Sequence, residues 1–372
     1  MKIVLLEPYF AGSHRSWAEG YRQHSRHQLE ILSLPGSHWK WRMHGGAISL
    51  AKRYIEQQLK PDLILATDML DLNLFLSLTR KVTANIPTAI YFHENQLTYP
   101  WSPKDEDTKQ QRDNHYSFIN YASALTADRV FFNSQYHCDT FLQALPAFLK
   151  AFPDHQETDR AALIKAKSSV LHLGLDLKAM DAIKPPKPEK PNRAVILWNH
   201  RWEYDKNPDF FFKVLTDIAE RGVEFKAIIL GQQYGKQPEC FEHFRNQYAD
   251  RILHYGYVAS REEYVKWLCM ADILPVTSQH DFFGASIVEA MYCDVIPLLP
   301  NRLAYPEHLP KQFHRTFFYD KDDELTNRLQ RMIFDVRVLR PQKVAHFIEK
   351  YDWSSLSKLY DEQLEGVTKP NT

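Results

Sequence analysis

The chain has 372 residues, with 46 basic and 46 acidic side chains, so its formal net charge at pH 7 is zero. The hydrophobic share of 44% is ordinary for a globular protein, and the length is enough for two domains with separate cores. No apolar run approaches the roughly 18 residues that a membrane-spanning helix needs. The N-terminal apolar run is too short for a signal peptide and lacks a cleavage site of small residues.

The cysteines are too far apart in the sequence to form a C-x-x-C pair. Their spacing therefore predicts neither a disulfide framework nor a zinc site, which is typical of a reduced, cytoplasmic protein. Because no long apolar run is present, no membrane partner is predicted. The four positions are Cys138, Cys240, Cys269 and Cys293.

Strand-like apolar segments alternate with segments of helical period along the first half of the chain, which is typical of parallel α/β units. The segment 47–59 has the clearest helical period. The predicted strands are 2–8, 29–35, 62–68, 88–94, 128–134 and the shorter 169–176.

Four prolines lie among the nine residues 184–192, and this density predicts a stiff linker. The alternation then restarts, with helices predicted at 207–222 and 283–294. We therefore predict two doubly wound domains, 1–183 and 193–345, with a ligand cleft between them at the carboxyl ends of the strands. The predicted strands of the second half are 194–200, 225–231, 252–258, 273–278 and 295–300.

The strongest chemical signal is SQHDFFGASIVEAMYCDVIPLL, residues 278–299. An apolar strand ends, a glycine turns the chain, and a helix is predicted to begin near Phe283. Unpaired backbone N–H groups at a helix start can hold a phosphate. Asp281 precedes the turn, and Glu289 follows eight residues later. The alternative is a capping aspartate and a surface glutamate.

The loop WNHRWEYDKNP, residues 198–208, carries Arg201 and Lys206 between a strand and a helix. A planar guanidinium and a compact ammonium five residues apart suit a diphosphate. An exposed basic loop without a ligand is the alternative.

Together these two elements resemble retaining glycosyltransferases of the GT-B fold, in the large family 4. That family carries an R-x4-K pair, matched by Arg201 and Lys206, and an E-x7-E motif, matched by DFFGASIVEAM. The chain departs from the motif at Asp281, where the family has glutamate, and at Phe282, where it has proline. The resemblance implies two Rossmann-like domains and a last helical segment, 346–372, that crosses back to the first domain.

The resemblance also implies roles. Arg201 and Lys206 would neutralise the leaving diphosphate, Asp281 would bind the hydroxyls of the donor sugar, and Glu289 would bind the ribose. Neither a metal nor another cofactor is implied, and no dedicated base. The implied catalytic residues are Asp281, His93, Arg201 and Lys206. The implied donor-binding residues are Gly12, Ser13, Arg201, Lys206, Gly256, Tyr257, Val258, Phe283, Gly284, Ala285, Ser286 and Glu289.

Two segments of the first half follow predicted strands and fit the same family. FAGSH, residues 10–14, resembles the glycine loop that approaches the donor phosphates, although a plain turn glycine at Gly12 explains it equally well. YFHENQLTYP, residues 91–100, places His93 at a strand end, where the family has a histidine that contacts the donor sugar. A structural histidine is the alternative.

A closer resemblance extends over nearly the whole chain, to the tRNA-queuosine mannosyltransferase group. It implies GDP-mannose as the donor, and as the acceptor a hydroxyl on the cyclopentene-diol of queuosine in a tRNA anticodon. The segments that carry it are EPYFAGSH, HWKWR, YFHENQLTYP, FNSQYH, HRWEYDKNP and HDFFGASIVEAMYC.

The segment SHWKWRMHGG, residues 37–46, lies in a locally basic stretch. Residues 11–54 contain seven lysines or arginines, five histidines and only two acidic residues. Arginine, lysine and aromatic side chains are what anticodon loops bind. The alternative is one tryptophan packed in the core beneath a solvated basic loop. The predicted acceptor-binding residues are His14, Trp39, Lys40, Trp41, Arg42, His93, Glu94, Asn95 and Gln96.

Two other functions compete with transfer to tRNA. A transferase with a glycan or lipid acceptor would want a basic amphipathic helix rich in apolar residues, and 15–30 is basic but weakly apolar. A non-catalytic protein that binds RNA or nucleotide sugars is favoured only by Asp281. The presence of Arg201, Lys206 and Glu289 argues against it. No oligomeric state is predicted.

Overall fold

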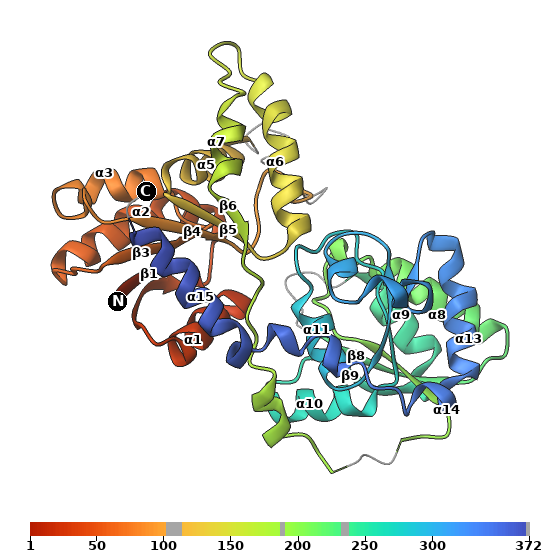
Figure 1. Ribbon diagram of the computed structural model, residues 1–372. Coiled ribbons are helices and arrows are strands. Elements are labelled where there is room, and N and C mark those ends of the chain that lie inside the picture. The colour runs from red at the N-terminus through yellow and green to blue at the C-terminus, as the bar shows by residue number, and fades with distance from the viewer. Residues whose placement is uncertain (102–113, 187–189, 232–237, 370–372) are drawn as a thin grey trace. The chain divides into compact units, whose positions relative to one another are not determined.

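The structure is a computed structural model that describes residues 1–101, 114–186, 190–231 and 238–369 (Figure 1). The chain forms two compact units, one made of Met1–Leu175 with Tyr351–Thr372 and the other of Asp176–Lys350. Each unit contains a six-stranded sheet in which all the strand pairs are parallel. The predicted α/β class is therefore confirmed. Among the described residues, no helix is both long enough and apolar enough to cross a bilayer.

The sheet of the first unit has the order β2-β1-β3-β4-β5-β6. Because β2 and β3 flank β1, the chain winds in opposite directions on the two sides of β1. The boundary between β1 and β3 is thus a topological switch point, where loops diverge and leave room for a ligand. The strands are β1 (Lys2–Phe10), β2 (Gln28–Pro35), β3 (Leu63–Thr67), β4 (Thr88–Phe92), β5 (Arg129–Phe132) and β6 (Ser168–Val170).

Helices cover both faces of this sheet, because its strands alternate apolar side chains between two buried faces. Val4 and Leu6 of β1 join the core beneath α2, α3, α5, α6 and α7, whereas Trp17 of α1 stacks on Tyr91 of β4. The helices are α1 (Gly12–His24), α2 (Trp39–Glu56), α3 (Leu72–Thr83), α5 (Asn114–Thr126), α6 (Gln135–Lys150), α7 (Arg160–Ala166) and α15 (Trp353–Thr368).

The end of the chain packs into the first unit through α15, which lies against α1 (Figure 1). Trp17 Nε1 donates a hydrogen bond to the Tyr360 hydroxyl at 3.0 Å, and the Tyr21 hydroxyl donates to Asp361 at 2.8 Å. The indole of Trp353 lies so close to Gly20 that an added Cβ there would be 2.1 Å from Trp353 Nε1. These contacts explain why a segment about 340 residues away belongs to the same core.

The units divide the chain at Leu175 and Lys350, not at the proline-rich segment used to predict the domain bounds 1–183, 184–192, 193–345 and 346–372. The second unit begins before the proline-rich segment, because Lys184 donates hydrogen bonds to Asp181 and to the carbonyl of Tyr292, both within that unit. Residues 187–189 of the predicted linker lie outside the described residues.

The sheet of the second unit has the order β12-β11-β10-β7-β8-β9. Its winding reverses between β7 and β10, so this boundary is a second switch point. The strands are β7 (Ala194–Trp198), β8 (Phe225–Leu230), β9 (Ile252–Gly256), β10 (Ile273–Pro275), β11 (Ile296–Pro300) and β12 (Phe318–Tyr319).

The core of the second unit lies mainly between β7, β8 and the apolar sides of three helices. Trp198 of β7 packs against Phe211 of α8 and Phe241 of α9. Leu215 of α8 and Leu329 of α13 belong to the same core cluster. The helices are α8 (Pro208–Glu220), α9 (Glu239–Gln247), α10 (Arg261–Met270), α11 (Ala285–Tyr292), α12 (His314–Phe317), α13 (Leu325–Phe334) and α14 (Val336–Leu339).

Candidate functional site

Lys206 and Asp281 meet at the switch point of the second unit. Lys206 ends a short 3-10 turn, Tyr204–Lys206, after β7, and Asp281 follows β10. Nζ of Lys206 lies 3.2 Å from Oδ2 of Asp281 and 3.0 Å from Oδ2 of Asp205. It also donates a hydrogen bond to the carbonyl of His280 at 2.9 Å. Two residues that were selected by sequence spacing are thus direct neighbours.

Both partners of this pair are held in their charged forms. Burial by itself lowers the pKa of Lys206, but the carboxylates of Asp281 and Asp205 outweigh burial and raise its pKa above the usual value. Burial likewise raises the pKa of Asp281, but the Lys206 ammonium outweighs it, so the pKa of Asp281 is lowered. The site therefore offers a fixed ammonium in a poorly hydrated place, where a charge interacts strongly with an anionic ligand.

Arg201, the other predicted cation, is much more accessible. Its side chain is 50% exposed and forms an ion pair with Glu203 at 3.2 Å. A guanidinium on an exposed loop can turn towards a ligand at little cost, whereas Lys206 is already fixed in place.

The turn between Asp281 and α11 depends on Gly284. This residue caps α11 with φ +85°, and a Cβ there would lie 3.1 Å from the ring of Tyr305. The Tyr305 hydroxyl donates a hydrogen bond to Oδ2 of Asp281 at 2.9 Å. The helix begins at Ala285, two residues later than predicted, because the left-handed glycine ends the loop. Tyr305, which the motifs do not include, therefore orients Asp281.

Glu289, the predicted ribose ligand, is already paired by two side chains of α10. Its carboxylate accepts hydrogen bonds from Arg261 Nη2 at 2.7 Å and from the Tyr264 hydroxyl at 3.0 Å. Asn199, after β7, donates to the carbonyl of Ser286 at 2.7 Å and ties the start of α11 to the switch point. Neither Arg261 nor Tyr264 could have been found by spacing, since no local pattern links α10 to α11.

His200 is a further residue of this site that sequence reasoning missed. It is 3% exposed, and its Nδ1 lies 3.1 Å from the Ser286 hydroxyl. Burial lowers the pKa of His200 to about 4, helped by the charge of Lys206, so the imidazole is neutral. The sequence signal that could have identified His200 is its position at the start of the HRWEYDKNP segment.

The segment predicted to hold the nucleobase lies at the end of β9, two strands away from β7 in the same sheet. Gly256 has φ +120°, and Tyr257 is 62% exposed. Val258 is half-buried. Since parallel strands end at one edge, this segment and Lys206 share the carboxyl edge of the sheet.

In the first unit, the predicted glycine loop and strand-end histidine meet at the switch point beside β1. His14, in the first turn of α1, lies with its ring centroid 4.1 Å from that of His93, which follows β4. Gly12 has φ +50°, and a Cβ added there would meet no atom within 4 Å. The exposed Ser13 follows it. The loop thus has open space above it, as an approaching ligand requires.

Within the described part of the chain, the hydrogen bonds that hold His93 are made by its backbone and not by its imidazole. Its N–H donates to Asp68 Oδ1 at 2.8 Å, and its carbonyl accepts from Asn133 Nδ2 at 2.8 Å. Nε2 is buried and has no hydrogen-bond partner among the described residues. The neighbouring Glu7 carboxylate bonds His14 Nδ1 at 3.0 Å.

Of the three residues after His93, two are used to hold the turn. Asn95 is fully buried and accepts from the Thr98 backbone, and the Gln96 backbone N–H donates to Asn120 Oδ1. Gln96 Nε2 donates to Glu94, which is the most accessible of the three. Direct contacts of Asn95 and Gln96 with an acceptor stay a prediction.

The basic aromatic segment is helical, since α2 begins at Trp39, so it is not the loop that the alternative described. A helix explains how its two tryptophans differ. Trp39 packs on Tyr116 with ring centroids 5.2 Å apart, whereas Trp41 is 64% exposed. The Trp41 ring lies over Gly45, where an added Cβ would be 2.8 Å from Cζ2. One tryptophan is thus structural, and the other presents a flat face to solvent.

The basic side chains of this segment contact one of its aromatic rings or the end of β2. Nζ of Lys40 lies 5.7 Å from the centroid of the Trp39 ring, and Arg42 Nε donates to the carbonyl of Pro35 at 3.0 Å. The imidazoles of His44 and His115 stack with centroids 4.5 Å apart. Aromatic rings and cations therefore gather at the start of α2 and the start of α5.

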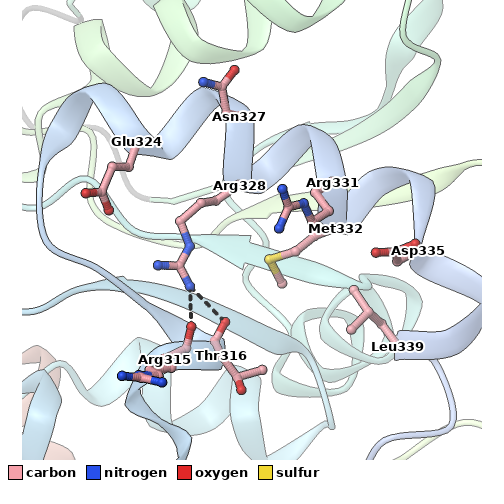
Figure 2. A pocket seen from close by; sticks show the side chains of 9 residues that line it. All are labelled: Arg315, Thr316, Glu324, Asn327, Arg328, Arg331, Met332, Asp335 and Leu339. Carbon is pink, nitrogen blue, oxygen red and sulfur yellow. Dashed lines mark hydrogen bonds between the residues drawn. The ribbon is translucent and has the colours of Figure 1, made fainter.

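A cavity of about 590 Å³ lies elsewhere in the second unit, between α12, α13 and α14 (Figure 2). Figure 2 shows Arg328 donating to the carbonyls of Arg315 and Thr316, at 2.6 and 3.3 Å. None of the predicted site residues lines this cavity.

The described residues contain one group of side chains close enough together to hold a metal ion. Potential ligand atoms of Glu7, His14 and His93 lie within 4.8 Å of one another. Glu7 already bonds His14, and the two imidazole rings are in contact, so these contacts explain the proximity without an ion. The prediction that no metal is needed stays untested.

Comparison with known proteins matches both units to glycosyltransferases. Residues 2–175 match the family described as tRNA-queuosine alpha-mannosyltransferase N-terminal, and residues 179–350 match the glycosyl transferases group 1. A tRNA-queuosine alpha-mannosyltransferase of Drosophila melanogaster is 33% identical over 362 residues, covering 95% of this chain and 93% of that protein. The chain belongs to this family of tRNA-queuosine alpha-mannosyltransferases. It is therefore a glycosyltransferase, as the motifs predicted.

Solved structures of glycosyltransferases share the fold. HepE of Anabaena, in complex with UDP and glucose, has a TM-score of 0.67 at 15% identity, over 98% of this chain and 99% of that one. Sucrose-phosphate synthase of Thermosynechococcus elongatus has a TM-score of 0.69 at 13% identity, over 99% of both chains. At such identities the likeness shows the fold alone, and it confirms the GT-B class.

Proposed function

We propose that this glycosyltransferase transfers mannose from GDP-mannose to a cyclopentene-diol hydroxyl of queuosine in a tRNA anticodon, with retention of the anomeric configuration. The observation that carries the proposal is the 33% identity to the Drosophila enzyme along 95% of the chain. The charged residues of the second unit agree with a diphosphate leaving group, and the aromatic surface of the first unit agrees with an RNA acceptor.

Stabilisation of the leaving diphosphate falls to Lys206, with Arg201 as a second cation. As the bond from the sugar to the phosphate breaks, negative charge grows on the phosphate oxygens, and preorganised cations lower the barrier. The backbone N–H groups at the start of α11, Ala285–Tyr292, are donors of the kind that bind phosphate at a helix N-terminus. Because Oδ2 of Asp281 faces Lys206 and Tyr305, we assign its other oxygen to the sugar hydroxyls.

Acceptor binding falls to the exposed surface at the start of α2. Unstacked bases of an anticodon loop bind flat aromatic faces, and their phosphates bind lysine and arginine. Trp41 offers the flat face, and Lys40 and Arg42 the charges. The proposed reaction needs no metal and no cofactor and takes place in the cytoplasm.

A mass measurement on nucleosides tests the proposal. The protein is incubated with queuosine-containing tRNA and GDP-mannose, and the tRNA is then digested and its nucleosides weighed. We expect queuosine to become heavier by one hexose. Parallel reactions with UDP-glucose, and with tRNA that lacks queuosine, serve as controls. Transfer from UDP-glucose alone would contradict the donor, and transfer to tRNA without queuosine would contradict the acceptor.

A further inference from the structure

Three ionisable side chains are buried together where β1 and β4 end, and the roles proposed above for the leaving group and the acceptor use none of them. Glu7 is 0% exposed, His14 6% and His93 8%. Oε2 of Glu7 accepts a hydrogen bond from Nδ1 of His14 at 3.0 Å, and Oε1 accepts one from the backbone of Tyr9 at 2.8 Å. A carboxylate is buried this completely only where its oxygens are paired, and here both are.

The ring of His93 is packed from several sides, but its Nε2 is unpaired. His14 lies 4.1 Å away between centroids, Trp17 4.7 Å and Tyr91 4.8 Å, the last two edge to face. Nε2 has no hydrogen-bond partner among the described residues. An unpaired buried polar atom destabilises a protein, and a ligand removes this penalty when it supplies the missing hydrogen bond. Ligands bind at this edge of a parallel sheet.

We propose that Glu7 and His14 are positioning residues, which hold the His93 ring so that its Nε2 accepts a hydrogen bond from a substrate hydroxyl. Glu7 orients His14 through the hydrogen bond, and His14 orients His93 because the two rings are in contact, with centroids 4.1 Å apart and planes tilted by 37°. The inference rests on the proposed function, because the substrate hydroxyl belongs to that transfer.

The charges around this group support the assignment. Burial lowers the pKa of His14, but the charge of Glu7 and the hydrogen bond to it outweigh burial and raise the pKa to about 9. Burial lowers the pKa of His93 well below its usual value, and the nearby cation His14 lowers it further. At neutral pH, His14 is therefore an imidazolium, and His93 is neutral and able to accept a hydrogen bond.

The other ionisable groups that face the pair come from three further segments. Asp68, after β3, has its pKa raised to about 8, since burial outweighs the opposing charge of His14. Glu94, after β4, acts on both Asp68 and His14, and His137 of α6 acts on His93. Because Asp68 titrates near the same pH, activity alone does not identify the titrating group, and His14 has to be observed directly.

The change Glu7→Gln tests the pair without removing its hydrogen bonds. The amide oxygen replaces Oε1 as the acceptor for Tyr9, and the amide nitrogen donates to the Nδ1 of a neutral His14. Only the negative charge is lost, so the His14 imidazolium should lose its proton at much lower pH. Glu30→Gln on β2, a half-exposed glutamate that pairs with Lys2, is the matched control.

The first measurement is an NMR titration of labelled imidazoles in the full-length protein, with Glu7→Gln and Glu30→Gln. We expect a His14 midpoint near pH 9 in the original protein and in Glu30→Gln, and a midpoint below about 7 in Glu7→Gln. A His14 midpoint near about 6.5 in the original protein would overturn the inference. This measurement needs no substrate.

The second measurement is the pH profile of transfer. We expect activity to fall as the pH rises through about 9, because His14 loses its proton there. At pH 8, Glu7→Gln should lower kcat roughly 10-fold or more with little change in KM, since the charge-assisted hydrogen bond that positions His14, and through it His93, becomes a weaker neutral one. An unchanged kcat and pH profile would overturn the inference. So would activity that a chelator abolishes and Zn²⁺ restores, because the three groups would then be metal ligands. If the original protein transfers no mannose, the proposed function fails, and the NMR midpoints still decide whether the pair exists.

Discussion

Lys206 is the residue on which the chemistry of the second unit depends, because two carboxylates compete for one ammonium there. Its Nζ lies 3.0 Å from Asp205 and 3.2 Å from Asp281, and its side chain is 9% exposed. Two negative charges around one positive charge leave the empty site with a net negative charge. A diphosphate must therefore approach with Arg201 and the start of α11 as further positive partners. Lys206 is the buried member of this set, and Arg201 the exposed one.

Lys206→Ala should lower kcat/KM roughly 10²-fold or more, because it removes the fixed cation from the leaving phosphate. Steady-state kinetics with GDP-mannose and queuosine-containing tRNA measures the effect. Lys213→Ala, on an exposed position of α8, is the control. A rate within about twofold of the original would remove Lys206 from the mechanism.

Tyr305 holds the carboxylate of Asp281 in place. This matters because aspartate is one methylene shorter than the glutamate of the family motif. The tyrosine hydroxyl fixes Oδ2 of Asp281 at 2.9 Å, and its ring supports the turn at Gly284. Tyr305→Phe removes only the hydroxyl, so the ring contact at Gly284 is kept.

We expect Tyr305→Phe to raise KM for the nucleotide sugar roughly 5- to 10-fold, from the loss of one hydrogen bond to a charged group. Binding of GDP alone should be nearly unchanged, because the sugar is absent. Calorimetric titration with GDP, beside kinetics with GDP-mannose, separates the two. Equal losses for both ligands would show that Tyr305 supports the whole turn and not the sugar contact.

At the scale of elements, α2 joins two functions in a single helix. Its later turns place Leu50 and Tyr54 in the core, while its first turn carries Trp39, Trp41 and the basic residues. Because residues three and four apart share a face, Trp41 and Gly45 lie one above the other, and the missing side chain of Gly45 lets the indole lie flat. The helix thus holds the proposed RNA surface rigidly against the sheet.

Trp41→Ala should weaken tRNA binding by about 1–3 kcal/mol, the usual loss when a stacked base loses its aromatic partner. The melting temperature should change little, since Trp41 is 64% exposed. Filter binding with queuosine-containing tRNA and thermal unfolding measure the two effects. Ile48→Ala, 56% exposed on the same helix, is the control. Unchanged tRNA affinity in Trp41→Ala would place the acceptor surface elsewhere.

At the scale of the whole molecule, the first unit is closed by a segment from the far end of the chain. Trp353 is 1% exposed, and its indole fills the space above Gly20 and Gly174. Asp361 accepts hydrogen bonds from Tyr21, Ser25 and the backbone of Arg26. The first unit therefore needs both ends of the chain, whereas the second is continuous.

Trp353→Ala should destabilise the first unit by about 3–5 kcal/mol, the usual cost of removing a buried aromatic side chain. Since the second unit has its own core, we expect urea to unfold the chain in two steps, of which the mutation shifts only one. Hydrogen exchange resolved along the sequence measures this. Equal loss of protection in 176–350 would show that the two units unfold together.

The sequence by itself determined the α/β class and most strand positions, and it selected Lys206 and Asp281 as candidate site residues. These features are local: apolar runs bounded by proline and glycine identify strands, and each of the two residues follows such a strand within its own motif. Only the tertiary structure decided which groups pair with the buried charges, and where the chain divides into units. Tyr305 and Tyr264 reach the site from other segments, and α15 joins a core that begins about 340 residues earlier. The physical reason is that burial and charge pairing depend on distances between segments far apart in the chain, which no local pattern contains.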